Sequence, residues 1–243
     1  MLKTLSLLMA GTVGCSAAEP PRVERRAARA AATKKKAARP RLGLPPGWTW
    51  PPNAQMKAEG KACLARIDAL GVEWNAGPAT QRIATPIVLP AMEIGGIKLT
   101  SMWRDGPFAM DCYLALAFAD GGAAALRDAG VVELRFSGIH SYRKVAGTKV
   151  LSRHALGLAI DVFEMVDRDG NKHVVKTDYL DRDEVLWAVE DKANDSGAFR
   201  MLLTPGNDPE NHSDHFHFEA RTASEANEPK LRVMTRPLER GRP

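Results

Sequence analysis

The sequence has no internal repeat and no strong bias toward one class of residue. Of its 243 residues, 44% are hydrophobic and 26% are charged, which is ordinary for a soluble globular protein. These values exclude a collagen, a coiled coil or a disordered tail as a description of the whole chain. The length is enough for one domain of moderate size.

Outside one short segment, the sequence also lacks an excess of basic residues. The chain has 34 Lys and Arg against 29 Asp and Glu, a net charge of +5. Residues 22–41 contain nine basic residues and a single acid, Glu24, so the rest of the chain from residue 42 is mildly acidic. An acidic folded part does not favour nucleic acid as a partner.

The first 18 residues have the three-part form of an export signal. Lys3 precedes a short apolar run, and small residues follow it. The run is too short to span a membrane as a mature helix. Residues 12–15 resemble a bacterial lipoprotein box, in which Cys15 would be lipidated and anchor the protein in a membrane, and the alternative is simple cleavage after Ala18. We therefore expect export to the periplasm or cell envelope.

Residues 19–54 are expected to form a basic and Pro-rich tether. Like charges at helical spacing repel one another, and the segment has no apolar face for packing. It is either a solvated spacer or a polycation that lies on anionic phospholipid or cell-wall polymer. Both alternatives keep the domain near the wall.

Only three cysteines are present, at positions 15, 63 and 112. If Cys15 belongs to the leader, Cys63 and Cys112 form an even pair in an oxidising compartment, which favours a disulfide. The alternative is two buried thiols, because both positions fall within helical apolar patterns.

Residues 55–222 are expected to form one domain, followed by a C-terminal tail at 223–243. Apolar periodicity predicts mainly helices first and strands later. The expected helices are residues 57–70, 107–118, 123–129 and 181–192, and the expected strands are 131–136, 158–165, 172–176, 199–203 and 215–219, with short strands or ordered loop at 77–99. This order favours the α+β class, with a small, predominantly antiparallel sheet and helices packed against it.

One carboxylate, Asp161, lies in the middle of an expected central strand. Its neighbours in the strand are apolar on both faces. A buried, unpaired carboxylate is costly, so Asp161 needs a cation, a hydrogen-bond network or a metal as its partner. His154 precedes it by seven residues, and Gly157 between them allows the chain to turn so that the two side chains converge.

Histidines gather in a second cluster, where three of the six fall within six residues. In the last expected strand, alternation places His215, His217 and Glu219 on one face and phenylalanines on the other. A catalytic zinc site needs three N or O ligands and one open position. His154, Asp161 and one strand histidine supply that set and leave the other histidine to handle protons. The alternative for each motif alone is a surface or core residue.

Two motifs carry a family resemblance. Residues 152–161 match S-x-H-x-x-G-x-A-x-D and residues 215–217 match H-x-H, a combination similar to the zinc D-Ala-D-Ala carboxypeptidases and their lysostaphin-type and hedgehog-type relatives. Over residues 55–220 the sequence more closely resembles the bacterial extensin-like C-terminal domain, a branch of that superfamily. The resemblance implies a hedgehog or D-Ala-D-Ala peptidase-like fold and cleavage of D-amino-acid-containing peptide bonds in peptidoglycan.

The resemblance also implies roles for individual residues. His154, Asp161 and His217 match the zinc ligands, and His215 matches the histidine that assists catalysis. The expected function is therefore that of an exported zinc metallopeptidase, a carboxypeptidase or endopeptidase acting on peptidoglycan peptides. The alternative is a non-catalytic, zinc-containing module for cell-wall binding or signalling, and the presence of His215 favours the enzyme.

Three further residues are expected around this site. Arg143 is similar to the arginine that faces the substrate carboxylate in the carboxypeptidases, with a structural ion pair as the alternative. His212 would line the site. Glu219 would orient the imidazole of a ligand.

Overall fold

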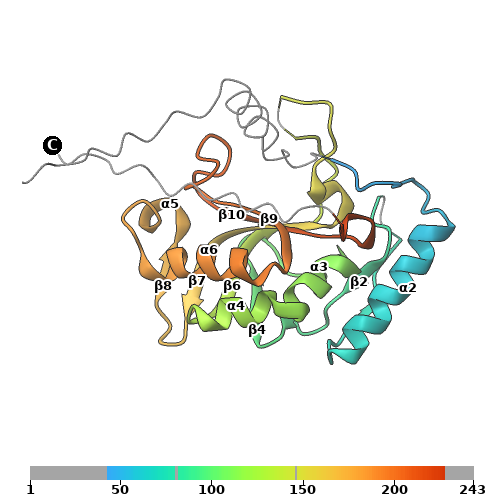
Figure 1. The fold of residues 1–243 in the computed structure, drawn as a ribbon. Helices are drawn as coiled ribbons and strands as arrows, with labels where there is room; N and C mark the ends of the chain where they lie inside the picture. The colour runs from blue at the N-terminus through green and yellow to red at the C-terminus, as the bar shows by residue number, and fades with distance from the viewer. Residues whose placement is uncertain (1–42, 80–81, 146, 228–243) are drawn as a thin grey trace, which may run out of the picture. The chain divides into compact units, whose positions relative to one another are not determined.

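The computed structural model describes residues 43–79, 82–145 and 147–227. Their central feature is a sheet in the order β3-β4-β6-β7-β10-β9, with β8 paired to the C-terminal half of β7 (Figure 1). Its strands are β3 (Glu93–Ile94), β4 (Ile97–Ser101), β6 (Val131–Gly138), β7 (Ala159–Asp167), β8 (Lys172–Val174), β9 (Phe199–Leu203) and β10 (Phe216–Ala220). All pairings are antiparallel except β4 with β6, which run parallel. The expected α+β class is confirmed, with one parallel pair added.

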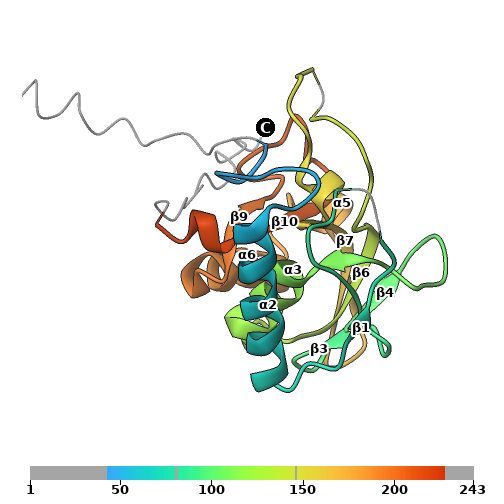
Figure 2. The ribbon, with the colours of Figure 1, turned by 90° about the vertical axis from the view of Figure 1, so that its right-hand side faces the viewer.

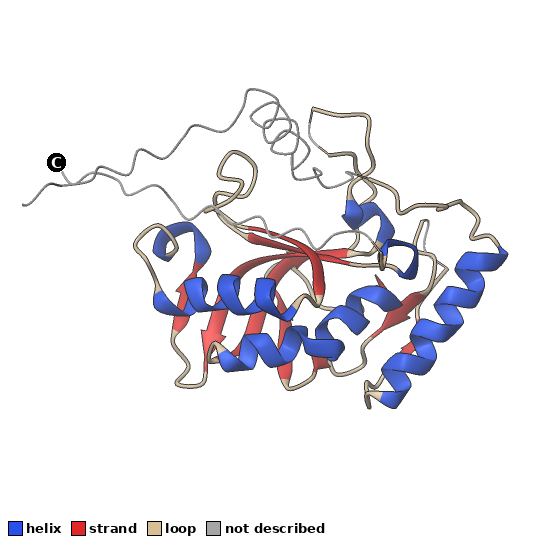
Figure 3. Cartoon of the chain, viewed as in Figure 1, coloured by secondary structure: helices blue, strands red, loops and turns tan. Residues whose placement is uncertain are grey.

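The longer helices gather on one side of this sheet (Figures 2 and 3). They are α2 (Ala54–Ala69), α3 (Cys112–Ala117), α4 (Ala123–Asp128) and α6 (Glu184–Ser196). Helix α3 contacts β10, α4 contacts β6 and α6 contacts β9, because each presents buried apolar side chains such as Leu126 of α4 and Leu186 of α6. No helix in the described part of the chain combines the length and hydrophobicity needed to cross a membrane.

Aromatic rings fill the space between the helices and the centre of the sheet. Phe118, which begins the short helix η1 (Phe118–Gly122), packs edge-on against Phe199 of β9 with ring centroids 5.1 Å apart. Phe199 in turn lies 5.0 Å from Phe218 of β10. Since neighbouring strand residues point to opposite faces, His217 and Glu219 of β10 point away from the helix-covered core.

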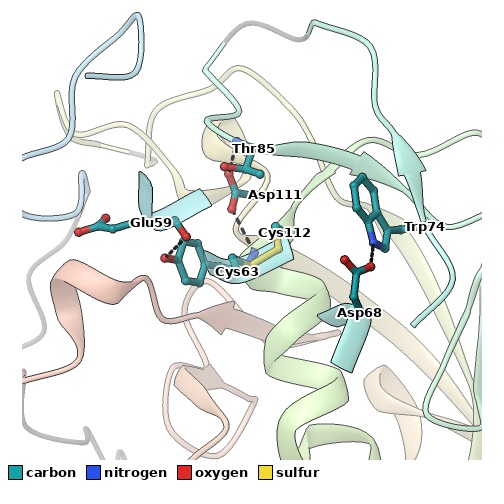
Figure 4. Close-up of a disulfide and its surroundings, with 8 residues drawn as sticks. Glu59, Cys63, Asp68, Trp74, Thr85, Asp111 and Cys112 are labelled. Atoms are coloured by element: carbon teal, nitrogen blue, oxygen red, sulfur yellow. Dashed lines mark hydrogen bonds between the residues drawn. A yellow bond between two sulfur atoms is a disulfide. The ribbon is translucent and has the colours of Figure 1, made fainter. Parts of the chain in front are cut away.

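A second, smaller sheet has the order β1-β2-β5, with β1 (Asn75–Ala76), β2 (Pro86–Val88) and β5 (Met110–Asp111). Beside it, a disulfide joins Cys63 of α2 to Cys112, the first residue of α3 (Figure 4). The two Cα atoms lie 6.2 Å apart. The disulfide, rather than two buried thiols, is therefore the state of these cysteines in the structure.

The predicted helix at 107–118 starts too early, because the structure begins α3 only at Cys112. Met110 and Asp111 pair with β2 instead. The carboxylate of Asp111 then caps the helix by accepting the N–H of Tyr113 at 3.1 Å, and it also accepts the N–H of Thr85 (Figure 4). A side chain that caps the helix and also bonds to the residue before β2 fixes the boundary more strongly than the preference of proline for a helix start.

The remaining elements match their predictions more closely. Strand β9 has the predicted bounds, and β6, β7 and β10 differ from theirs by one or two residues at an end. The predicted strand at 172–176 ends at Val174, and the short helix α5 (Val175–Asp178) follows it. The expected export signal, Cys15, most of the tether and most of the tail lie outside the described residues.

Candidate metal centre

His154 lies beside β7 and β10 because the chain makes a tight turn just before β7. It lies in the 3₁₀ turn η2 (Arg153–Leu156), which the Ser152 hydroxyl caps by accepting the N–H of His154 at 3.3 Å. Gly157 ends the turn with a φ of +67°. A Cβ at this position would lie 2.9 Å from the backbone nitrogen of Asp111, so both the conformation and the space require glycine.

Asp161 and His217 face each other directly across two strands. Asp161 of β7 pairs with His217 of β10 in the antiparallel register, so both side chains point to the same face of the sheet. Three atoms meet there: Asp161 Oδ1 lies 2.7 Å from His217 Nδ1 and 3.0 Å from His154 Nε2, and the two nitrogens are 3.1 Å apart. All three residues are at most 7% exposed.

The outward-facing nitrogens of both histidines have acceptors as partners. His154 Nδ1 lies 3.0 Å from the carbonyl oxygen of Ile139, and His217 Nε2 lies 3.2 Å from Glu219 Oε1. In neutral imidazoles these nitrogens carry the hydrogens and donate them, which leaves His154 Nε2 and His217 Nδ1 as acceptors. Three acceptors then converge on one point, an arrangement that requires a proton or a metal cation among them.

The donor set fits zinc. Two imidazole nitrogens and one carboxylate oxygen are common ligands of a catalytic zinc, whose bonds of about 2.0–2.1 Å place tetrahedral ligand atoms about 3.3 Å apart. The 2.7–3.1 Å separations of the three facing atoms are close to this value. The bonds to Ile139 and Glu219 are also of the kind that fix the tautomer of metal-binding histidines.

The electrostatics of the cluster favour a positive charge at its centre. Burial opposes ionisation of Asp161, but its short contacts with the rings of His154 and His217 hold its pKa well below the usual range. Burial likewise opposes charge on His217, yet its bonds to Asp161 and Glu219 raise its pKa to about 9. Burial lowers the pKa of His154. Without a metal, the proton that this centre needs therefore resides on His217.

His215 lies beside the three converging residues and not among them. It immediately precedes β10, and its Nε2 lies 3.5 Å from Asp161 Oδ1. Its Nδ1 donates to Asp214 Oδ1 at 2.8 Å, and its ring stacks on Phe163 with centroids 4.9 Å apart. The structure thus separates the two histidines, with Nδ1 of His217 in the cluster and Nε2 of His215 at its edge.

Arg143 and His212 border the same centre. The Arg143 guanidinium donates to Asp161 Oδ2 at 3.3 Å, while 54% of its side chain stays exposed. The ion pair expected as the alternative for Arg143 is therefore present. His212 packs 4.9 Å from the ring of His215 and hydrogen-bonds through Nδ1 to Asp208. Mainly because of burial, the pKa of His212 falls to about 4, so it is neutral at pH 7.

Sequence reasoning missed a second layer of charges behind the metal centre. Arg153, Arg200 and Glu225 are each at most 3% exposed and join Glu219 in a buried network. Arg200 carried the same signal as Asp161, a charged residue inside an apolar strand. Glu225 follows the last strand and carried no comparable signal.

The described part of the chain is thus an α+β domain with two buried histidines and an aspartate that converge on one face of its main sheet. Residues 61–228, more than half of the chain, match the family described as extensin-like protein C-terminus. The chain therefore belongs to the extensin-like C-terminal family, and the cluster of His154, Asp161 and His217 lies inside the matched region. No curated protein and no solved structure matches the sequence.

Proposed function

We propose that this protein is a zinc-dependent peptidase that cleaves D-amino-acid-containing peptide bonds of peptidoglycan. The observation that carries the proposal is the convergence of three buried acceptor atoms, from His154, Asp161 and His217, beside a fourth side chain that can move a proton. The substrate class rests on the resemblance of the two histidine motifs to the D-Ala-D-Ala metallopeptidases.

The residues divide the work between holding the metal and moving a proton. When bound, zinc supplies a Lewis acid that polarises the scissile carbonyl and lowers the pKa of a water toward roughly 7. His154, Asp161 and His217 hold it, and ionised Asp161 offsets part of its charge. His215 accepts the proton of the attacking water at Nε2, because Asp214 fixes the hydrogen on Nδ1.

An exposed cationic side chain at the edge of the site suits a substrate that carries carboxylates. The exposed part of the Arg143 guanidinium is available to a peptide carboxylate. Next to it, Tyr142 is 53% exposed, and the guanidinium carbon of Arg82 lies 5.9 Å from its ring. Stem peptides of peptidoglycan present such carboxylates, and carboxypeptidase and endopeptidase action are both compatible with this edge.

Export belongs to the same proposal. The signal-like first 18 residues and the basic tether would place the enzyme in the periplasm or cell envelope, with lipidated Cys15 as the membrane anchor. The disulfide between Cys63 and Cys112 supports an oxidising compartment.

The test compares three single variants of the whole chain. His217→Ala should lose most bound zinc, whereas His215→Ala should keep the zinc and lose turnover by about 10²–10⁴-fold. His173→Ala, a histidine outside the site, should retain both. Zinc is measured by metal analysis, and cleaved peptides released from purified peptidoglycan are measured by mass spectrometry.

The possible results separate the candidate functions. A zinc-loaded wild type that releases no cleaved peptide would contradict the peptidase and favour the non-catalytic wall-binding module. Loss of zinc in His215→Ala with retention in His217→Ala would reverse the roles of the two histidines.

A further inference from the structure

We propose that four buried charged residues, Arg153, Arg200, Glu219 and Glu225, act together as positioning residues that set the metal affinity of the centre. The inference rests on the proposed zinc site and extends it to residues outside the ligand set. We call these four residues the charge clamp.

Glu219 is the member of the charge clamp that touches a metal ligand. Its Oε1 accepts from His217 Nε2 at 3.2 Å, and its Oε2 lies 2.5 Å from Arg200 Nη1 and 3.9 Å from Arg153 Nε. Both carboxylate oxygens are thus occupied by cationic or N–H partners. Glu219 can rotate away from His217 only by breaking a buried ion pair, so the ring of His217 is fixed with Nδ1 toward the metal position.

A β-bulge brings Arg200 to this face of the sheet. Glu219 pairs with Met201, but the next residue, Ala220, pairs with Phe199, so Arg200 has no residue opposite it. In a regular strand Arg200 would point to the face opposite that of Met201. The extra residue redirects its side chain toward Glu219, which is a common use of bulges next to functional sites.

Glu225 links a second ligand of the proposed site, His154, to the same network. It lies at the end of the 3₁₀ turn η3 (Ala223–Glu225), just after β10, and is 1% exposed. One carboxylate oxygen bonds to Arg153 Nη1 at 3.2 Å, and the other bonds to Arg153 Nη2 and lies 3.1 Å from Arg200 Nε. Arg153 is the residue directly before His154, so Glu225 anchors the turn that carries this ligand.

Stability alone does not explain why four charges are buried here. The charge clamp contains two cations and two anions at 1–6% exposure, and taking such groups out of water costs about as much as their attraction returns. Apolar residues of similar volume would often be as stable or more stable. Apolar residues, however, could not accept the hydrogen of His217 Nε2, and they could not anchor the turn that carries His154 through an ion pair.

The experiment measures zinc affinity in the whole chain by competition with a chromophoric chelator, together with the visible spectrum of the Co²⁺-loaded protein. Glu219→Gln and Glu225→Gln should each bind zinc about 10–100-fold more weakly than wild type and alter the Co²⁺ spectrum. The matched control is Glu190→Gln. Glu190 is also buried, with 7% exposure, but it lies in α6 on the helix side of the sheet, where it bonds to Tyr179 and Thr204. Its zinc affinity should stay within about two-fold of wild type.

A purely structural role predicts a different pattern. In that case the melting temperature of the metal-free protein would fall in all three variants while zinc affinity and the Co²⁺ spectrum stayed unchanged, and the inference would be overturned. If Glu225→Gln does not fold, Glu225→Asp replaces it in the experiment, because it keeps the charge on a shorter side chain. Glu225→Asp should still weaken zinc binding. If the wild type itself binds no zinc, the proposed function fails and the inference fails with it. If wild type and variants bind zinc with equal affinity, only the inference is overturned.

Discussion

Gly157 decides whether His154 can reach the metal centre. The turn needs a φ of +67°, and an added Cβ would lie 2.9 Å from the backbone of Asp111 and 3.0 Å from the side chain of Ile83. We expect Gly157→Ala to lower the free energy of unfolding by about 2–4 kcal/mol, the combined effect of left-handed backbone strain and a steric conflict in a packed region. Urea unfolding followed by circular dichroism measures the change.

Gly170 provides the matched control for this substitution. It lies in the turn between β7 and β8 with a φ of +83°, and a Cβ there would meet no atom within 4 Å. Gly170→Ala should therefore cost only the backbone strain, about 1 kcal/mol. Equal losses in the two variants would show that the close approach of Gly157 to Asp111 has no energetic importance.

The same residues show what could be predicted from the sequence. The approach of His154 to Asp161 could be predicted because one glycine turn between them is a local property. Strand alternation places His215 and His217 on the same face, so the choice of His217 as their partner rested on the resemblance to the metallopeptidases. The bond between Arg153 and Glu225 could not, because it joins residues 72 positions apart and depends on how the chain turns after β10. The contact of Arg200 with Glu219 depends on a bulge that no residue type in β9 signals.

Among the secondary-structure elements, α2 and α3 are held together by the disulfide. The bond between Cys63 and Cys112 closes a loop with a sequence separation of 49 residues. The chain entropy that such a loop removes from the unfolded state corresponds to about 4 kcal/mol of stability. We expect the double variant Cys63→Ser/Cys112→Ser to lose roughly this amount in urea unfolding.

Reduction gives an independent check of that value. Wild type unfolded in the presence of dithiothreitol should match the double variant, and the reductant should not change the double variant itself. Identical unfolding of oxidised and reduced wild type would contradict a stabilising disulfide between α2 and α3.

His173 connects β8 to both of its neighbours in a way that depends on pH. Its Nδ1 lies 2.8 Å from Asp183, the cap of α6, and its Nε2 lies 3.4 Å from Asp167 at the end of β7. Partial burial opposes the charge, but the bond to Asp183 and the attraction of both carboxylates raise the pKa of His173. Both ring nitrogens can donate to carboxylates only in the imidazolium form.

A raised pKa means that protonated His173 stabilises the fold. This contribution is complete below the ordinary pKa of 6.5 and is lost as the pH rises through the raised value. His173→Ala should therefore lower the free energy of unfolding at both pH values. The loss relative to wild type should be about 0.5–1 kcal/mol larger at pH 5 than at pH 9. The packing lost with the ring is the same at both values, so the difference isolates the charge. A constant difference between pH 5 and pH 9 would exclude the proposed ion pairs.

At the scale of the whole molecule, the candidate metal centre joins three separate parts of the chain. Its ligands come from η2, β7 and β10, and His154 and His217 are 63 positions apart in the sequence. An unfolded chain cannot present these three atoms together, so zinc held by the proposed site would bind the folded state in preference to the unfolded one. Binding must then stabilise the fold by mass action.

Zinc should raise the melting temperature of the metal-free protein by an amount that grows with its concentration. At a free zinc concentration of about 100 times the dissociation constant, the gain is about 2.7 kcal/mol, which corresponds to roughly 5–10 °C for a domain of this size. Scanning calorimetry of chelator-treated protein, with and without added zinc, measures the shift. His217→Ala should show almost none of it, because two remaining ligands hold the ion poorly. An equal shift in wild type and His217→Ala would mean that zinc stabilises the chain from a site other than the cluster of His154, Asp161 and His217.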